Sequence, residues 1–139
     1  MSWRSGLHTL GPGSPVVLAV TETPLLNETL KAALDGLAVL RRLPAGLSDL
    51  DDLVRHIAPD AVVVDSDEGA TSLAPAAAAC AAPLVHISLK TRELRVFRES
   101  EWHAFPSWET SPNSIRNVLI GAIYASATGH REIGERSLL

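Results

Sequence analysis

Hydrophobic and polar residues fall in blocks along the chain that predict strands and helices in turn. Residues 15–20 (PVVLAV) are continuously apolar and rich in β-branched side chains, which is typical of a strand buried on both faces. In residues 21–37, leucines and alanines recur at three- and four-residue steps. This spacing predicts an amphipathic helix, with Thr23 as its cap and Pro24 at its first position.

The same order repeats in the next part of the chain. Residues 38–46 predict a second strand, and its greater polarity indicates a place near a sheet edge. Residues 47–60 predict a helix that Ser48 caps, with acids in its first turn and basic residues in its last. Charges placed in this way complement the helix dipole. Residues 60–65 (DAVVVD) then predict the clearest strand of the chain.

The pattern changes in the second half of the chain. Residues 70–83 predict a short helix with Pro75 near its start, and residues 83–88 (PLVHIS) predict a fourth strand. Residues 89–106 contain no apolar stripe long enough for a crossover helix. We interpret them as an extended segment or hairpin, with a fifth strand near the WHAF sequence at its end. A last helix, capped by Ser111, is predicted over residues 111–127.

Strands that alternate with helices through short connections pair in parallel, with helices on both faces of the sheet. We therefore expect one α/β domain at residues 15–127, a three-layer flavodoxin-like sandwich with a five-stranded parallel sheet. Its fourth helix is shortened or replaced by an extended segment. A flexible leader at residues 1–14 and a C-terminal helix extension or flexible tail at residues 128–139 flank this domain.

Composition excludes several classes of function. The chain has 139 residues and a net charge of −4, and its basic residues are scattered, so direct binding of nucleic acid is not expected. No apolar run approaches the ~20 residues of a membrane span, and no signal-peptide core is present. The single cysteine, Cys80, excludes an internal disulfide and a cysteine-cluster metal site. We expect a cytoplasmic protein in which Cys80 is a structural thiol.

Polar residues and one aromatic residue stand at the carboxyl ends of the predicted strands. The carboxyl ends of parallel strands meet at one edge of a sheet, so these residues are expected to converge. No lysine is among them. The polar residues are Thr21, Glu22, Asp65, Ser66, Asp67 and Ser88, and the last predicted strand ends in Phe105 and Pro106.

This arrangement resembles the receiver domain of bacterial two-component response regulators over about residues 15–127. The PDAVVVDSDEG sequence is similar to the family's third strand, which ends in the phospho-accepting aspartate, here Asp65. VVLAVTETPLL resembles the first strand, which the family follows with an acid pair for Mg²⁺. PLVHIS resembles the fourth strand, which ends in a threonine or serine, here Ser88. HAFP resembles the fifth strand, where the family has a Lys-Pro pair.

The chain also departs from the family pattern. Thr21 and Glu22 stand in place of the acid pair, so one metal carboxylate is missing, and Phe105 replaces the lysine. Mg²⁺ takes oxygen ligands and usually one or two carboxylates, which leaves Glu22 and Asp65 as its candidate ligands. Phosphoryl transfer depends on positioning and charge neutralisation, and both are weakened by these changes.

These departures lead us to expect an atypical receiver, or pseudo-receiver, rather than an enzyme. Such a signalling module would work without a cofactor or aspartyl phosphorylation. It would contact other signalling proteins, such as a histidine kinase or a regulator chain, and form a homodimer. Two alternatives stay open: a Mg²⁺-dependent receiver in a phosphorelay with Asp65 as acceptor, and a small-molecule-binding flavodoxin-like domain. A role in transcription regulation would require an output domain outside this chain.

Several of these residues also have simpler interpretations. Asp65 is a solvated strand end, a structural position or a phosphoacceptor. His86 lies in an apolar strand and is expected to be a core or half-buried histidine. Trp102, Phe105 and Trp108 lie close together in the sequence, and they either cap the end of the sheet or form a partner surface.

Overall fold

The computed structural model describes residues 14–44, 46–88, 90–91, 93–105 and 111–123. Six strands form one sheet in the order β2-β1-β3-β4-β5-β6. The strands are β1 (Val16–Val20), β2 (Val39–Arg42), β3 (Ala61–Val64), β4 (Leu84–Ser88), β5 (Glu93–Arg98) and β6 (Glu101–Ala104). The helices within these ranges are α2 (Pro24–Leu34), α3 (Leu50–Ile57), α4 (Asp67–Ala79) and a last helix at residues 112–123. The expected α/β class is thus confirmed.

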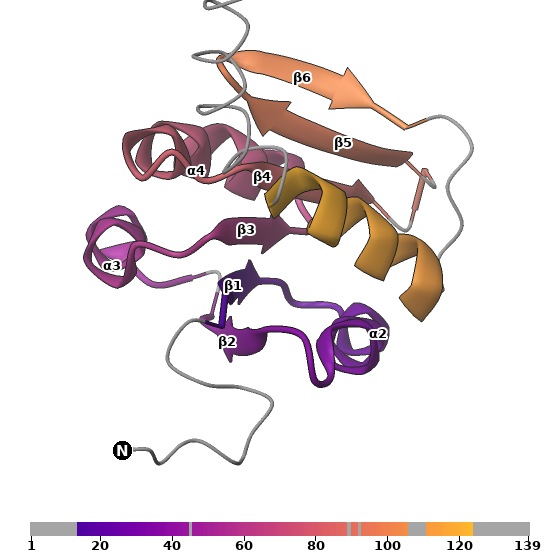
Figure 1. The fold of residues 1–139 in the computed structure, drawn as a ribbon. Helices are drawn as coiled ribbons and strands as arrows, with labels where there is room; N and C mark the ends of the chain where they lie inside the picture. The colour runs from indigo at the N-terminus through magenta and orange to yellow at the C-terminus, as the bar shows by residue number, and fades with distance from the viewer. Residues whose placement is uncertain (1–13, 45, 89, 92, 106–110, 124–139) are drawn as a thin grey trace, which may run out of the picture.

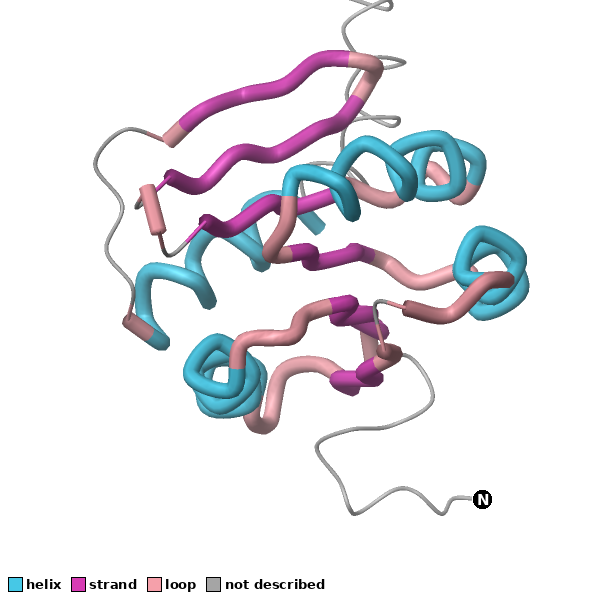
Figure 2. The backbone as a smooth tube through the Cα atoms, turned by 180° about the vertical axis from the view of Figure 1, so that it is seen from behind, coloured by secondary structure: helices cyan, strands magenta, loops and turns pink. Residues whose placement is uncertain are grey.

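Helices cover both faces of the parallel part of the sheet. The α2 helix and the helix of residues 112–123 lie on one face, and α3 and α4 lie on the other (Figures 1 and 2). Alternate residues of each strand point to opposite layers, so that Val17 packs against α2 and Leu18 packs against α3 and α4. The strands β1 and β3 are buried along almost their whole length, as their continuous apolar sequences predict.

The sheet differs from the predicted five-stranded parallel sheet at one edge. Strand β5 pairs with β4 in antiparallel orientation, and β6 pairs antiparallel with β5. Only residues 89–92 connect β4 to β5, whereas a parallel crossover needs a dozen residues or more. A hairpin therefore replaces the fourth crossover helix, which is one of the two forms that we expected for this segment.

The hairpin turns at Glu99 and Ser100, which have φ angles of 54° and 66°. Positive φ at both central residues is the signature of a type I′ turn, which matches the twist of the two strands. Leu94 and Val96 point toward α2 and the last helix and are buried. Phe97 packs against the opposite hydrophobic cluster.

The helix starts agree only in part with the sequence pattern. Ser111 caps the last helix as predicted, since its Oγ accepts a hydrogen bond from the Ser114 N–H at 3.2 Å. The N-cap of α3 is Asp49 rather than Ser48. Helix α4 begins at Asp67, earlier than expected, so that Pro75 lies inside it. Pro75 has no N–H to donate to the carbonyl of Thr71, one turn earlier in the helix. Thr71 is exposed, so water can bond to that carbonyl instead.

Several expectations concern residues that the structure does not describe. The predicted leader lies almost entirely in residues 1–13, and the predicted tail lies in residues 128–139. Pro106 and Trp108 also lie outside the described ranges. None of the helices within those ranges is long and apolar enough to cross a membrane.

Candidate functional site

Asp65 follows β3 and bonds to the chain around the start of α2. Its Oδ2 accepts hydrogen bonds from the Glu22 N–H at 2.9 Å, the Thr23 N–H at 3.0 Å and the Thr23 hydroxyl at 2.8 Å. The strands β1 and β3 are neighbours, with Val20 opposite Val64, so the two segments that follow them lie side by side. Asp65 thus holds the N-terminal end of a helix in place from a different part of the chain.

The predicted metal position next to Asp65 holds one buried hydroxyl and one exposed acid. Thr21 is 9% exposed, and its hydroxyl donates a hydrogen bond to Asn27 Oδ1. The Glu22 side chain is exposed, and only its backbone N–H bonds to Asp65. Within the described ranges, no three or more His, Cys, Asp and Glu side chains gather in a way that could hold a metal ion. Glu22 and Asp65, the candidate Mg²⁺ ligands that the sequence suggests, are not part of such a group.

Ser88 bonds to the turn that follows it, and Phe105 follows a strand that is not next to β4. The Ser88 Oγ accepts hydrogen bonds from the Thr91 hydroxyl at 2.8 Å and the Thr91 N–H at 3.3 Å, which shapes the turn toward β5. Phe105 follows β6, and β5 lies between β6 and β4. The structure therefore does not bring Phe105 to the strand next to Ser88, where the resemblance expects the family's lysine.

A second polar cluster is formed by His86, Arg95, Asp67 and Trp102. His86 is 4% exposed and lies opposite Arg95 in the ladder between β4 and β5. The Arg95 Nη2 lies 2.8 Å from the His86 Nδ1. Arginine can only donate, so Nδ1 is the acceptor and the ring proton is assigned to Nε2. That nitrogen lies 3.5 Å from the Asp67 carboxylate.

Arg95 is held between an acid and an aromatic ring. Its Nη2 lies 3.8 Å from the Asp67 carboxylate, and its guanidinium carbon lies 4.6 Å from the centre of the Trp102 ring. Trp102 also packs against Phe97, with 5.0 Å between the ring centres. The guanidinium therefore makes an ion pair and a cation–π contact at the same time. Its Nε is buried and has no hydrogen-bond partner in the described part of the chain.

The environment of His86 favours its neutral form. Burial lowers its pKa from the ordinary value of 6.5, and the nearby Arg95 cation lowers this pKa further. The carboxylates of Asp67, Glu93 and Asp65 act in the opposite direction. His86 is thus a buried histidine of the sheet, as its apolar sequence context predicts.

The sequence did not point to Arg95 as part of this site. In the sequence, Arg95 stands out only as one of the polar positions in the alternating polar and apolar segment ELRVFRE. Which residue it would meet depends on the register between β4 and β5. The structure therefore holds two polar arrangements, a carboxylate after β3 that bonds to the start of α2 and a cation within β5 that contacts Asp67 and Trp102.

The comparisons with known proteins do not assign the chain to a family. No family model matches it, and neither does any curated protein.

Proposed function

We propose that this chain is an atypical receiver, or pseudo-receiver, that acts by protein–protein contact and independently of aspartyl phosphorylation. The observation that carries this proposal is the use of Asp65. Three donors from the segment that opens α2 bond to its Oδ2. A carboxylate that holds a helix in place is a structural element, and its modification would disturb the fold around it.

The order of the parallel strands also supports the proposal. The order β2-β1-β3-β4, with helices on both faces, agrees with doubly wound flavodoxin-like sheets. Asp65 follows β3, which is where the resemblance to receivers places the phospho-accepting residue. The β5–β6 hairpin occupies the part of the chain where that family has its fourth helix. A switching surface in this protein would therefore consist of other elements than in typical receivers.

The β5–β6 hairpin provides the contact surface that we propose. Strand β6 lies at the edge of the sheet, and hydrogen-bonded pairs alternate along an antiparallel ladder. The Phe105 N–H bonds to the Leu94 carbonyl, so Trp102 and Ala104 direct their own backbone groups away from β5. No strand in the described part of the chain pairs with that edge. The Trp102 side chain is 37% exposed beside it.

We propose a second copy of the chain as the partner at this edge. If two β6 strands pair antiparallel about an axis at His103, then Trp102 of each copy lies opposite Ala104 of the other. The small Ala104 leaves room for the indole, and both outward-facing residues gain hydrogen-bonded pairs. An isologous contact of this kind closes as a dimer. Other signalling proteins, such as a histidine kinase or a regulator chain, would contact the face of the same hairpin.

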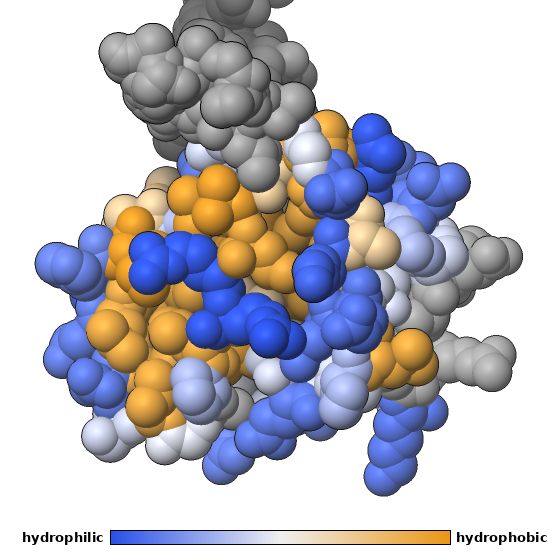
Figure 3. All heavy atoms as spheres, turned by 90° about the horizontal axis from the view of Figure 1, so that it is seen from below, coloured by the Kyte–Doolittle hydropathy of each residue, from blue (hydrophilic) through white to orange (hydrophobic). Residues whose placement is uncertain are grey.

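The opposite edge of the sheet is less suited to such pairing. Strand β2 ends in Arg41 and Arg42, both exposed. Figure 3 shows the molecule from below relative to Figure 1. In this view, strongly hydrophilic side chains lie across a hydrophobic area of the surface. Like charges on an edge strand oppose its pairing with a second copy.

A phospho-accepting receiver is the second candidate, and one observation favours it. The Asp65 Oδ1 accepts no hydrogen bond from the described residues, and the exposed Glu22 follows β1 beside it. These two carboxylates would hold Mg²⁺, which would supply the charge neutralisation that phosphoryl transfer needs.

A titration with Mg²⁺ and beryllofluoride, a phosphoryl mimic, tests the proposal against this alternative. The amide spectrum of the whole chain is followed, with Asp65→Asn as the control variant. We expect no saturable change in the wild-type spectrum. A saturable change that disappears in Asp65→Asn would show that Asp65 is a working acceptor site and would reject the phosphorylation-independent proposal.

A further inference from the structure

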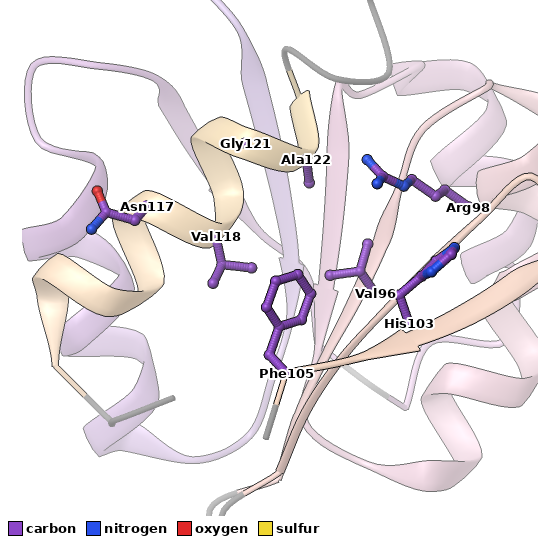
Figure 4. Close-up of a pocket in the computed structure, with 8 residues that line it drawn as sticks. All are labelled: Val96, Arg98, His103, Phe105, Asn117, Val118, Gly121 and Ala122. Atoms are coloured by element: carbon purple, nitrogen blue, oxygen red, sulfur yellow. The ribbon is translucent and has the colours of Figure 1, made fainter. Parts of the chain in front are cut away.

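A groove lies between the β5–β6 hairpin and the last helix (Figure 4). Val96 and His103 alternate with Phe97 and Trp102 along the two strands, so the groove lies on the opposite face of the hairpin from Trp102. Its volume is about 240 Å³, which is below the ~300–1,000 Å³ of sites for drug-sized ligands. The groove is therefore sized for a small molecule or for one short part of a larger one. Its lining residues are Val96, Arg98, His103, Phe105, Asn117, Val118, Gly121 and Ala122.

Most of the groove surface is apolar. The Phe105 ring lies between the hairpin and the helix, and Val96 and Val118 lie on either side of it (Figure 4). Val96 and Ala122 are buried, whereas Phe105 is 40% exposed. A ligand in the groove would remove this exposed aromatic surface from water, which favours an apolar ligand body.

The polar end of the groove carries two nitrogen-bearing side chains. Arg98 and His103 lie side by side on the hairpin, at the edge of the groove (Figure 4). Within the described residues, Arg98 has no carboxylate within 4.0 Å, although Glu101 lies opposite it in the ladder. A guanidinium binds a carboxylate through two parallel hydrogen bonds. The groove therefore combines an apolar body with an end that carries a guanidinium.

The helix wall leaves the groove open at Gly121. A Cβ atom added at this position would meet nothing within 4 Å. A helix with glycine in its interior is less stable than one with alanine there, so helix formation does not explain why Gly121 is a glycine. Asn117 points away from the hairpin (Figure 4), which leaves Arg98 and His103 as the polar groups that face the groove.

We propose that this groove binds a small amphipathic carboxylate, with one carboxylate group and a short aliphatic or aromatic body. The carboxylate contacts Arg98 and His103, and the body lies against Phe105, Val96 and Val118. The groove is lined by residues of one copy and lies apart from Asp65, and only His103 also lies at the axis of the proposed dimer. The proposal therefore does not depend on the function proposed above.

Octanoate is a suitable probe, and octanol and octylammonium are its matched neutral and cationic forms. The amide spectrum of the whole chain is followed during each titration. We expect saturable shifts for octanoate in β5, β6 and the last helix. Octanol is expected to bind about tenfold more weakly, since it loses a charge-assisted hydrogen bond, and octylammonium more weakly still. No saturable shift, shifts centred elsewhere, or equal affinity for octanol would overturn the proposal.

Paired variants locate the site. Arg98→Gln is expected to weaken octanoate binding about tenfold and to leave octanol binding unchanged. Arg116→Gln is the charge-matched control. Arg116 is exposed on the last helix, which forms the other wall of the groove, but it does not line the groove itself. An equal effect of the two variants would overturn the proposal.

Gly121→Leu tests the groove itself by filling it. This variant is expected to abolish binding of octanoate and octanol together, while the amide shifts of β1 and β3 stay at their wild-type positions. Unchanged binding in a folded Gly121→Leu protein would overturn the proposal. If Gly121→Leu does not fold, the comparison of Arg98→Gln with Arg116→Gln decides the question.

Discussion

The four parallel strands and the β5–β6 hairpin belong to one sheet but are built from different kinds of residue. Strands β1 and β3 consist of apolar side chains buried between two helix layers. From Glu93 to Phe97, strand β5 alternates charged or aromatic with aliphatic side chains, and β6 is largely exposed. Strands β1 and β3 therefore form a buried scaffold, whereas the hairpin can carry surface chemistry.

Polar side chains show the same difference between the two parts. At the carboxyl end of β3, the Asp65 Oδ2 is committed to the segment that opens α2. On the hairpin, Trp102 lies exposed beside the sheet edge, and Arg98 and His103 flank a groove. The residue that first suggests chemistry is thus already hydrogen-bonded through one carboxylate oxygen. The less distinctive hairpin carries the surfaces for which we propose binding.

Removal of the Asp65 carboxylate is expected to have the largest effect on stability. Asp65→Ala leaves the Glu22 and Thr23 N–H groups without their acceptor, and we expect the free energy of unfolding to fall by about 2–3 kcal/mol. Urea denaturation measures this loss. Asp60→Ala is the control, since Asp60 Oδ2 accepts one bond, from the Val16 N–H at 2.8 Å. Equal losses in the two variants would contradict the anchoring role of Asp65.

Removal of the Trp102 side chain is expected to have a smaller effect, because the ring is part of the exposed hairpin. Trp102→Ala loses the contacts with Phe97 and Arg95, and we expect a loss of about 1–2 kcal/mol in urea denaturation. Leu25→Ala is the control, because Leu25 is 63% exposed and its change should stay within about 0.5 kcal/mol. A loss as large as that of Asp65→Ala would place the hairpin in the stabilising core.

The buried histidine is expected to give the smallest effect, visible as a pH dependence. Because the pKa of His86 is lowered in the folded chain, the unfolded chain binds this proton first as the pH falls below about 6.5. The free energy of unfolding should therefore decrease from pH 7 toward pH 5. In His86→Gln, we expect a shallower decrease in urea denaturation over the same range. Identical pH profiles would show that His86 does not contribute.

Much of the parallel part of the fold could be predicted from the sequence. Its strands are continuous apolar runs and its helices carry regular stripes, so the local pattern determines both. The hairpin was predicted only as one of two forms, because the turn at Glu99 and Ser100 lacks the glycine or asparagine that usually marks a type I′ turn. The neighbour of each hairpin strand depends on pairing between distant residues, which no local pattern contains.

The candidate site was predicted to a similar extent. The place of Asp65 at the end of β3 followed from the valine run before it. Its bonds to Glu22 and Thr23 depend on how two loops meet, and the contact of Arg95 with His86 depends on strand register. Side-chain identity at a strand end therefore indicates where polar groups gather, but not which of them are already engaged.

The contact surface at the edge of β6 is tested most directly by sedimentation of three proteins over a range of concentrations. Ala104→Pro removes an N–H that points away from β5, and Arg42→Pro makes the matching change on β2, at the opposite edge. We expect a concentration-dependent dimer for the wild type and for Arg42→Pro, and a folded monomer for Ala104→Pro. A wild-type protein that is monomeric at every concentration, or a dimer that persists in Ala104→Pro, would contradict the proposed role of the hairpin.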